Sequence, residues 1–282
     1  MIDKKDYIIK QLHRARNKKF ENYVITRIWH FLDDLDIKFV TQQYIVRPNG
    51  YALADLFFPQ FNIIVEVDEA YHLGQKIADN MREKDIINAA NFKIIRVDTS
   101  KSIESIHSQT DDIVTVIKEL KATGYQKWDY EKEFDIQQYI NKGYIDLDDN
   151  AVFLKSVDAC NCFSANYKGW QRGEAPHKFR RNTTLWFPKL YEGGEWGNKI
   201  NLNEDLILES NEEADKNEGQ LNNLLGGSEK IRYVFSHTKD NLGTTLYRFK
   251  GEFTLNKERT VEMRKAVWER TNTRVDTINI KK

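Results

Sequence analysis

Residues 51–58 read YALADLFF and residues 62–72 read NIIVEVDEAYH, and these two stretches decide the fold of the first half of the chain. Both are rich in apolar and β-branched residues, which is typical of strands. The Phe-Pro-Gln-Phe at 58–61 breaks the pattern between them. The sequence therefore predicts a short hairpin, with paired strands over 51–58 and 62–67.

Four carboxylates lie where this hairpin ends: Asp55, Glu66, Asp68 and Glu69. Clustered like charges repel and raise one another's pKa, so a fold tolerates them when a divalent cation neutralises the group. Carboxylate oxygens suit Mg²⁺ or Mn²⁺. Solvation at a hairpin end would explain a lone acid, but Glu66 is embedded in Ile-Ile-Val-Glu-Val, where an unpaired charge is rarely tolerated. The sequence predicts a metal-dependent phosphodiesterase site.

The segments around the hairpin complete one structural unit. Apolar spacing predicts helices over 20–32, 75–90 and 103–120 and another strand over 92–97. This order resembles the PD-(D/E)XK nucleases, and EVDEAYH at 66–72 is similar to the strand text E-V-D-x-x-x-H of their Vsr-like branch. The resemblance implies a nuclease domain with a mixed sheet flanked by helices.

The resemblance also implies a role for each acid. Asp55, Glu66 and the main-chain carbonyl of Val67 would hold a metal ion that polarises a phosphodiester oxygen and lowers the pKa of a bound water. Asp68 and Glu69 would bind a second ion or orient that water.

The chain departs from the superfamily at the lysine that gives it its name, because Asp68 stands two residues after the second acid. His72 is the nearest candidate for the proton-transfer or phosphate-contacting role, with His30 and Lys76 behind it. A lone histidine is more often structural than catalytic. Glu21 precedes His30 by nine residues, which at about 100° per residue places them on opposite faces of a helix. Glu21 and His30 therefore cannot both point into one site, and His72 is the first-ranked candidate for the role of the missing lysine.

Length and composition bound what the chain can be. Its 282 residues are enough for two domains of ordinary size. It has no apolar stretch long enough to span a bilayer and no signal-peptide pattern at its start, so we expect a soluble, cytoplasmic protein without a membrane partner. Cys160 and Cys162 are too close for an ordinary disulfide and lack partners for a zinc site, so we expect both to be structural or incidental.

The net charge is zero, with 43 basic and 43 acidic residues, which argues against a dedicated nucleic-acid binder. The distribution weakens that argument. Seven lysines and arginines crowd the first twenty residues, and a second basic group spans residues 177–181, whereas residues 203–219 hold seven acids and one lysine. The basic groups are therefore either positive surfaces that can meet phosphates or ordinary solvated faces.

The sequence changes character near residues 121–127, where a helical pattern ends and a glycine follows. We expect a nuclease domain over 1–122, a linker over 123–135 and a second domain over 136–282. Apolar stretches in the second half predict strands of a mixed α+β or barrel-like domain, at 151–154, 183–187, 231–236 and 245–255. The polar segment 201–229 is expected to be an insertion or mobile loop.

One segment of the second half, WFPKLYEGGEWGN at 186–198, interleaves aromatic residues with glycine and ends in a carboxamide. A base flipped out of duplex DNA needs aromatic faces to stack on and a polar group to read its edge. The alternative is a core strand followed by a glycine turn, with the aromatics packed as ordinary core. On this segment alone, the core interpretation is the stronger.

Taken together, the two halves resemble the modification-dependent restriction endonucleases of the AbaSI type. The resemblance rests on the EVDEAYH strand, on the 186–198 segment and on VFSHTKDNLGTTLYRFKGEF at 234–253, and it covers nearly the whole chain. It implies an α+β protein with a C-terminal SRA-like, β-barrel-type domain. That domain would flip 5-hydroxymethylcytosine or its glucosylated form in double-stranded DNA, and both strands would be cut at a distance with Mg²⁺. A homodimer is implied, with one metal site per strand.

Carried over residue by residue, the resemblance implies a pocket for the modified base. Tyr191 and Trp196 would stack on the base, Asn198 would hydrogen-bond its edge and Trp186 would shape the wall. Two weaker candidates belong to the same pocket, Glu192 and Ser236.

Two other functions stay open. A strand-nicking repair endonuclease that recognises a mismatch would cut at the lesion, without dependence on cytosine modification. A non-catalytic reader of modified DNA would have a decayed nuclease half, since the superfamily lysine is missing, but the intact Asp55, Glu66 and Asp68 argue against it.

Overall fold

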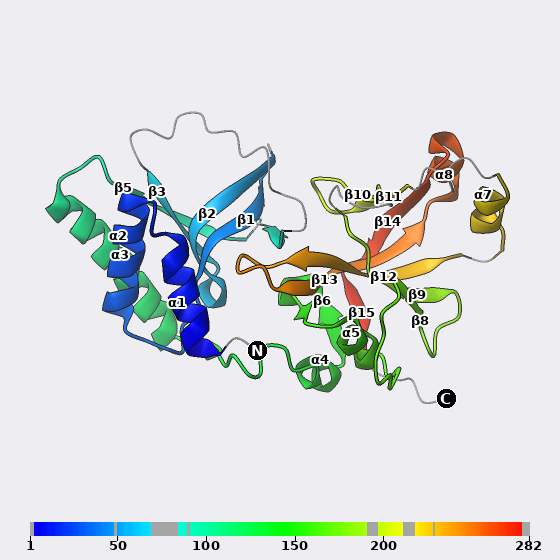
Figure 1. Cartoon of the computed structure of the whole chain (residues 1–282), viewed down its shortest axis with the longest axis horizontal. Helices are drawn as coiled ribbons and strands as arrows, with labels where there is room; N and C mark the ends of the chain where they lie inside the picture. Colours follow the sequence, from blue (N-terminus) through cyan, green and yellow to red (C-terminus); the bar gives the residue numbers. More distant parts are fainter. Residues whose placement is uncertain are drawn as a thin grey trace. The chain divides into compact units, whose positions relative to one another are not determined.

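The structure is a computed structural model, and it describes residues 3–47, 50–68, 84–88, 91–190, 197–210, 218–227 and 229–277. The chain divides into two compact units, drawn in Figure 1. Unit 1 comprises Met1–Asp79 and Ile86–Glu133, and unit 2 comprises Asn80–Asp85 and Phe134–Lys282. No helix among the described residues is both long and apolar enough to cross a membrane.

Unit 1 contains a five-stranded mixed sheet in the order β4-β1-β2-β3-β5, with helices beside it (Figure 1). Its elements are α1 (Lys4–Arg14), α2 (Lys19–Leu32), β1 (Val40–Arg47), β2 (Gly50–Phe58), the 3₁₀ turn η1 (Pro59–Phe61), β3 (Ile63–Asp68), β4 (Ile86–Asn88), β5 (Lys93–Asp98) and α3 (Ile103–Ala122).

The predicted hairpin is formed by β2 and β3. They pair antiparallel in a register that joins Leu56 to Val65. One residue further along the same register, Asp55 lies opposite Glu66, so both acids stand at the same end of the hairpin. On the other side of β3, the parallel strand β5 brings Arg96 beside Glu66.

The larger core of unit 1 lies between the sheet and helices α2 and α3. The buried apolar residues of α2 follow the helical period: Val24, Ile25, Ile28 and Leu32. They pack with Val65 and Val67 of β3. Glu21 lies one turn before Val24, so it shares this inward face of the helix and is only 3% exposed. A carboxylate is thereby carried into the protein on an otherwise apolar face.

Some elements differ from the sequence-based expectations. Residues 86–88, expected within a helix, form β4, which pairs parallel with β1. Residues 75–83 of that expected helix lie outside the described residues. A short apolar run such as Ile86-Ile87 fits the period of a helix and that of a strand, so periodicity could not distinguish the two structures here. The segment 201–229, expected to be a loop, contains β11 and α7, and neither α1 nor β1 was expected.

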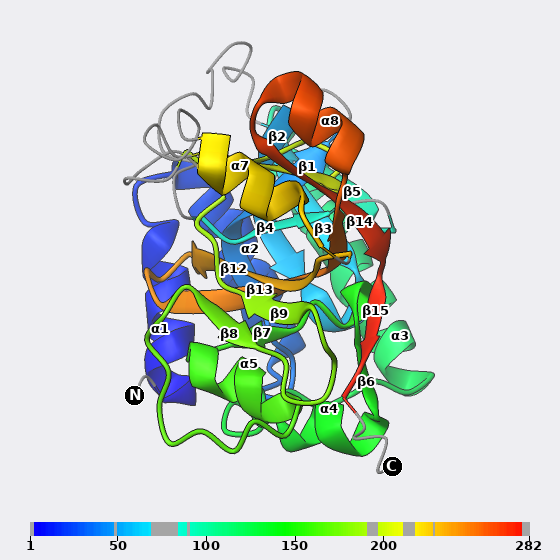
Figure 2. The ribbon, with the colours of Figure 1, turned by 90° about the vertical axis from the view of Figure 1, so that its right-hand side faces the viewer.

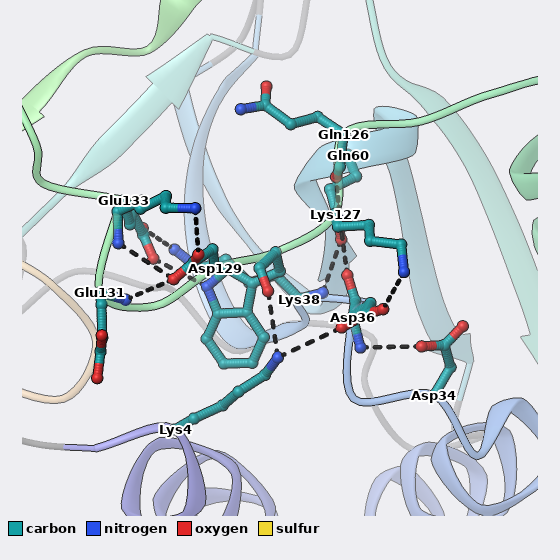
Figure 3. Close-up of polar contacts among 12 residues, drawn as sticks. Lys4, Asp34, Asp36, Lys38, Gln60, Gln126, Lys127, Asp129, Glu131 and Glu133 are labelled. Atoms are coloured by element: carbon teal, nitrogen blue, oxygen red, sulfur yellow. Dashed lines mark hydrogen bonds and ion pairs between the residues drawn. The ribbon is translucent and has the colours of Figure 1, made fainter. Parts of the chain in front are cut away.

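Most of the expected linker, residues 123–135, is built into unit 1 (Figure 3). Trp128 is buried, and its main-chain N–H donates to the Asp36 carbonyl at 2.8 Å. Its indole Nε1 donates to Glu133 Oε2 at 3.0 Å, and Lys4 Nζ donates to its carbonyl at 3.1 Å. Unit 1 therefore extends to Glu133 and not only to residue 122.

Unit 2 is built on an eight-stranded sheet in the order β10-β11-β14-β13-β12-β9-β8, with β7 paired to β13 and a separate pair β15-β6. Helices α7 and α8 lie near the same end of this sheet (Figure 2). Its elements are α4 (Gln137–Lys142), β6 (Tyr144–Asp146), η2 (Leu147–Asp149), β7 (Val152–Phe153), α5 (Ser156–Cys162), β8 (Glu174–Pro176), β9 (Thr183–Trp186), β10 (Lys199–Ile200), β11 (Leu206–Glu209), α7 (Glu218–Leu225), β12 (Ile231–Lys239), β13 (Thr245–Leu255), α8 (Lys257–Met263), β14 (Ala266–Asn272) and β15 (Arg274–Asp276).

The long strands β12 and β13 divide the core of unit 2 in two. Tyr233 and Phe235 enter the cluster that contains α5, whereas Val234 enters the cluster around Trp268. A bulge in β13 is made possible by Gly251, whose φ is 108° and where a Cβ atom would lie 2.8 Å from a main-chain oxygen of β14. Both cysteines are free and buried in the first cluster.

Unit 2 also contains a buried ion pair that joins distant parts of the sequence. The Arg248 guanidinium of β13 donates to both carboxylate oxygens of Asp85, and each residue is less than 10% exposed. Arg248 Nη1 also donates to the Asn150 carbonyl at 3.0 Å, and the Asp85 N–H donates to the Lys239 carbonyl at 2.7 Å. Residues 84 and 85 are thereby held on unit 2, although β4 of unit 1 begins at the next residue.

Candidate active site

Four side chains of unit 1 form one polar network, which we call the Glu21 cluster: Lys18, Glu21, Gln42 and Asp55. Gln42 Nε2 lies 2.5 Å from Glu21 Oε1 and 3.3 Å from Asp55 Oδ1, so one amide bridges two acids. Lys18 Nζ donates to Glu21 Oε2 at 2.8 Å and to Gln42 Oε1 at 2.9 Å. The same nitrogen lies 4.0 Å from Asp55 Oδ1.

The strands hold the acids of the hairpin end in position. Asp55 Oδ2 accepts the main-chain N–H of Val67 at 2.8 Å, which ties the carboxylate of β2 to β3. Glu66 Oε2 lies 3.3 Å from Arg96 Nε of β5. Asp68, at the end of β3, is exposed, and its carbonyl accepts the Thr99 hydroxyl at 2.9 Å.

Burial and a neighbouring acid perturb the carboxyl group of Glu21. Burial, and next to it the negative charge of Asp55, raise the pKa of Glu21 to about 7, although Lys18 acts in the opposite direction. Near neutral pH this carboxyl group is therefore protonated in a large share of the molecules. A divalent cation that replaces the proton would relieve the repulsion between the two acids. Carboxylate oxygens are the donors that Mg²⁺ and Mn²⁺ prefer, so the residues fit such an ion.

Gln42 holds its bridging position in a strained backbone conformation. Its φ is 56°, in the left-handed region, although it lies within β1, where the register places it opposite Asp55. For a residue other than glycine this conformation costs about 1–3 kcal/mol, and such strain clusters at functional sites. The strain and the two acid contacts together make the Glu21 cluster a candidate functional site.

The structure brings some of the predicted site residues together and not others. Asp55 contacts Val67, and Glu66 is the residue before Val67 on β3. His30 is exposed on the face of α2 opposite Glu21, so the fold does not bring it to the acids. Within the described ranges, no three His, Cys, Asp or Glu side chains are grouped so as to hold a metal ion. Three predicted residues lie outside those ranges: Glu69, His72 and Lys76.

Sequence reasoning missed three members of the Glu21 cluster. For Glu21 a signal was present, because a charged residue at helical spacing from Val24 and Ile28 falls on the apolar face of its helix. Neither Gln42 nor Lys18 carries a local signal, since their approach to the acids depends on the packing of α2 and β1 against the hairpin.

In unit 2, the ring of Trp186 is packed against another side chain. The Arg232 guanidinium lies 4.2 Å from the Trp186 ring centre and 4.0 Å from that of Trp268. Arg232 also pairs with Glu209 at 2.6 Å and with Glu174 at 3.0 Å. Trp186 is buried in the same core cluster as Trp268, between an arginine and this second tryptophan.

Asn198, predicted to read the edge of the base, is one of several residues of unit 2 that bury a side-chain polar atom without a partner among the described residues. It is 6% exposed, and its Oδ1 has no hydrogen-bond partner among the residues that the structure describes. Leaving a buried polar atom unpaired costs about 1–3 kcal/mol, so such atoms call for an explanation. Ser236 is fully buried on β12. The three other predicted pocket residues lie outside the described ranges: Tyr191, Glu192 and Trp196.

Comparison with known proteins covers both units. Residues 5–121 match the N-terminal domain of PvuRts1I-like restriction endonucleases, and residues 138–277 match the SET and RING associated (SRA) domain. The chain is similar to the solved structure of the 5-hydroxymethylcytosine-specific restriction enzyme AbaSI, with 36% sequence identity and a TM-score of 0.83. That match covers 96% of this chain and 97% of that chain. Among curated proteins, none matches.

These findings define a DNA endonuclease in which a nuclease unit is joined to a unit that binds modified DNA. The chain belongs to the AbaSI-type family of modification-dependent restriction endonucleases. Its restriction activity thus depends on modified cytosine, and its nuclease class uses a divalent metal ion. The expected α+β architecture, with a nuclease domain followed by an SRA domain, is confirmed.

Proposed function

We propose that the protein recognises 5-hydroxymethylcytosine, and its glucosylated form, in double-stranded DNA by flipping the base, and that it cleaves both strands at a distance with Mg²⁺. The observation that carries the base-reading step is the buried Asn198, whose amide oxygen has no partner among the described residues of unit 2. The likeness to an enzyme specific for 5-hydroxymethylcytosine supports the choice of modification.

In the nuclease unit, Asp55, Glu66 and the carbonyl of Val67 would hold the Mg²⁺ ion. When bound, the ion would offset charge on the phosphodiester and lower the pKa of a water. The Val67 N–H orients Asp55, and Arg96 holds Glu66. Asp68 and Glu69 would orient the water or complete a second metal site, and His72 would serve the proton transfer.

In the recognition unit, Asn198 would hydrogen-bond the Watson–Crick edge of the flipped base, because one amide offers both a donor and an acceptor. Trp186 would shape the wall, and Tyr191 and Trp196 would stack on the base. Two further residues would complete the pocket, Glu192 and Ser236.

One nuclease site cuts one strand, so cleavage of both strands calls for two sites. We infer that the protein acts on DNA as a homodimer, in which each copy supplies the acids for one strand. The mismatch-nicking alternative needs no such pairing and predicts cuts in unmodified DNA.

The base-reading role is tested with the variant Asn198→Ala. Extruding a cytosine costs a few kcal/mol, which contacts in the pocket must offset. Losing the amide should weaken binding to 5-hydroxymethylated duplex by roughly one to two decades, at about 1.4 kcal/mol per decade. Any residual cutting should lose its preference for modified sites and keep its metal dependence. Affinity and cleavage are measured on modified and unmodified duplexes of one sequence.

A matched control is Asn222→Ala, which removes the same side chain from the exposed surface of α7. It should leave both affinity and preference unchanged. If Asn198→Ala keeps the parent's preference, the amide does not read the base and the 186–198 segment is ordinary core.

A further inference from the structure

Two cationic side chains of the described structure reach the acids of the proposed nuclease site. Arg96 pairs with Glu66, and Lys18 pairs with Glu21 and lies near Asp55. Strand β3 itself supplies acids at its end and no lysine. Among the described residues, Lys18 therefore supplies the ammonium group beside Glu21 and Asp55, the two acids that Gln42 bridges.

The position of Lys18 differs from that of an ordinary buried partner of an acid. It occupies the N-cap position of α2, with an extended backbone, just before the helix that carries Glu21 inward. The side chain of Lys18 is 42% exposed, whereas that of Glu21 is 4% exposed. The side chain of Lys18 is therefore far more open to solvent than the carboxylate that it contacts.

The hydrogen bonds of this ammonium group leave one of its donors available to a substrate. It has three donors. In the described structure two of them are directed at Glu21 Oε2 and Gln42 Oε1. These two contacts fix the nitrogen in place, and a third donor can meet a phosphate oxygen. A fixed donor costs little reorganisation when charge develops beside it, which is the condition for electrostatic catalysis.

We propose that Lys18 is a catalytic residue of the nuclease site, whose ammonium group contacts a nonbridging oxygen of the scissile phosphate. This rests on the proposed nuclease function. In the hydrolysis a water oxygen forms the new bond to phosphorus, and the bond to the departing sugar oxygen breaks with its electron pair. The water gives up one proton and the departing oxygen takes up one. Lys18 keeps its proton throughout and stabilises the charge that grows on the phosphate.

The test replaces the ammonium group and then restores it chemically. Lys18→Cys introduces a thiol at a partly exposed site, and treatment with 2-bromoethylamine converts it to an aminoethyl thioether that carries an ammonium group. The native cysteines should not compete, because both are buried and burial raises the pKa of Cys160 to about 12 and that of Cys162 still further. Lys19→Cys, at the exposed next residue, is the matched control.

The readout is the single-turnover rate of cleavage of 5-hydroxymethylated duplex at saturating Mg²⁺. We expect Lys18→Cys to lower this plateau rate by about 10²–10³-fold, as for loss of one fixed donor to the transition state. Aminoethylation should restore it to within about tenfold of the parent, and alkylation with iodoacetamide, which adds no charge, should not. Lys19→Cys should match the parent before and after both treatments.

A purely structural role predicts a different result. If Lys18 only offset the charge of Glu21, its loss would make the site more negative and would not weaken metal binding. Saturating Mg²⁺ would then return the plateau rate to within about threefold of the parent. That result would overturn the proposal, as would equal rescue by iodoacetamide and bromoethylamine.

Folding and the nuclease function itself are checked separately. Binding of modified duplex in EDTA should be unchanged in the variant, and if the cysteine variant does not fold, Lys18→Gln against Lys19→Gln gives the same comparison. A parent protein that cleaves no DNA would overturn the proposed function and the assignment of Lys18 with it. If the parent cleaves DNA and Lys18→Cys cleaves it at the same rate, the Lys18 assignment alone is overturned.

Discussion

Replacement of Glu66 by alanine is expected to lower the cleavage rate of modified DNA by two or more orders of magnitude. Glu66 lies opposite Asp55 in the hairpin register, and both would hold the ion that offsets phosphate charge. Removing either carboxylate would remove a proposed metal ligand, so Asp55→Ala should show a similar loss. The measurement is the single-turnover rate in Mg²⁺ for the parent and both variants.

Binding should survive these substitutions, because unit 2 carries the SRA domain. Affinity for 5-hydroxymethylated duplex, measured in EDTA, should therefore stay close to that of the parent. The matched control is Glu119→Ala, on the exposed side of α3, which should cleave at the parent rate. A Glu66→Ala variant that cleaves at nearly the parent rate would show that the metal site lies elsewhere.

The second large effect concerns stability. Arg248→Ala should lower the free energy of unfolding of unit 2 by about 3–5 kcal/mol, because removing one partner of a buried ion pair leaves the other charge unpaired. The charge left behind is that of Asp85, which is almost fully buried. Denaturant unfolding of the parent and the variant, followed by tryptophan fluorescence, measures the difference.

A matched pair elsewhere in unit 2 provides the control. Arg259 pairs with Glu269 at 2.7 Å, but its side chain is half exposed. Exposed pairs contribute about 0–1 kcal/mol, so Arg259→Ala should change stability little. If the two variants lose equal stability, the Arg248–Asp85 pair is not the buried anchor that the structure describes.

The sequence alone was sufficient to predict the helices and strands whose apolar residues follow a clear pattern. The hairpin, helices α2 and α3 and strand β5 lie close to their expected bounds, because apolar and β-branched runs mark the strands and helical spacing marks the buried face of each helix. Strand β4 was expected to be helical, since three residues are too few to reveal a period. Helix α1 was missed because only Tyr7 and Gln11 of its eleven residues are buried.

The boundaries between the units could not be found from local composition. Residues 84 and 85 belong to unit 2 through contacts such as that of Asp85 with Arg248, which lies 163 residues away in the sequence. The segment that leads to Glu133 reads as a polar linker, yet buried Trp128 fixes it to unit 1. Because these contacts join residues far apart in the sequence, the spacing of apolar residues around either partner does not reveal them.

For the candidate site, the acids of the hairpin end were found because they are local in the sequence. Glu21, Gln42 and Lys18 reach Asp55 from α2, β1 and the N-cap of α2. Their approach depends on how these elements pack, and the left-handed φ of Gln42 has no signature in its residue type.

Dependence on modified cytosine is tested most directly by digesting one DNA sequence prepared in four forms, with cytosine, 5-methylcytosine, 5-hydroxymethylcytosine or glucosylated 5-hydroxymethylcytosine. With Mg²⁺ present, we expect double-strand cleavage of the two hydroxymethylated forms, at positions displaced from the modified base, and no cleavage of the unmodified form. Equal cleavage of all four forms, or single-strand nicks in unmodified DNA, would contradict the proposed function.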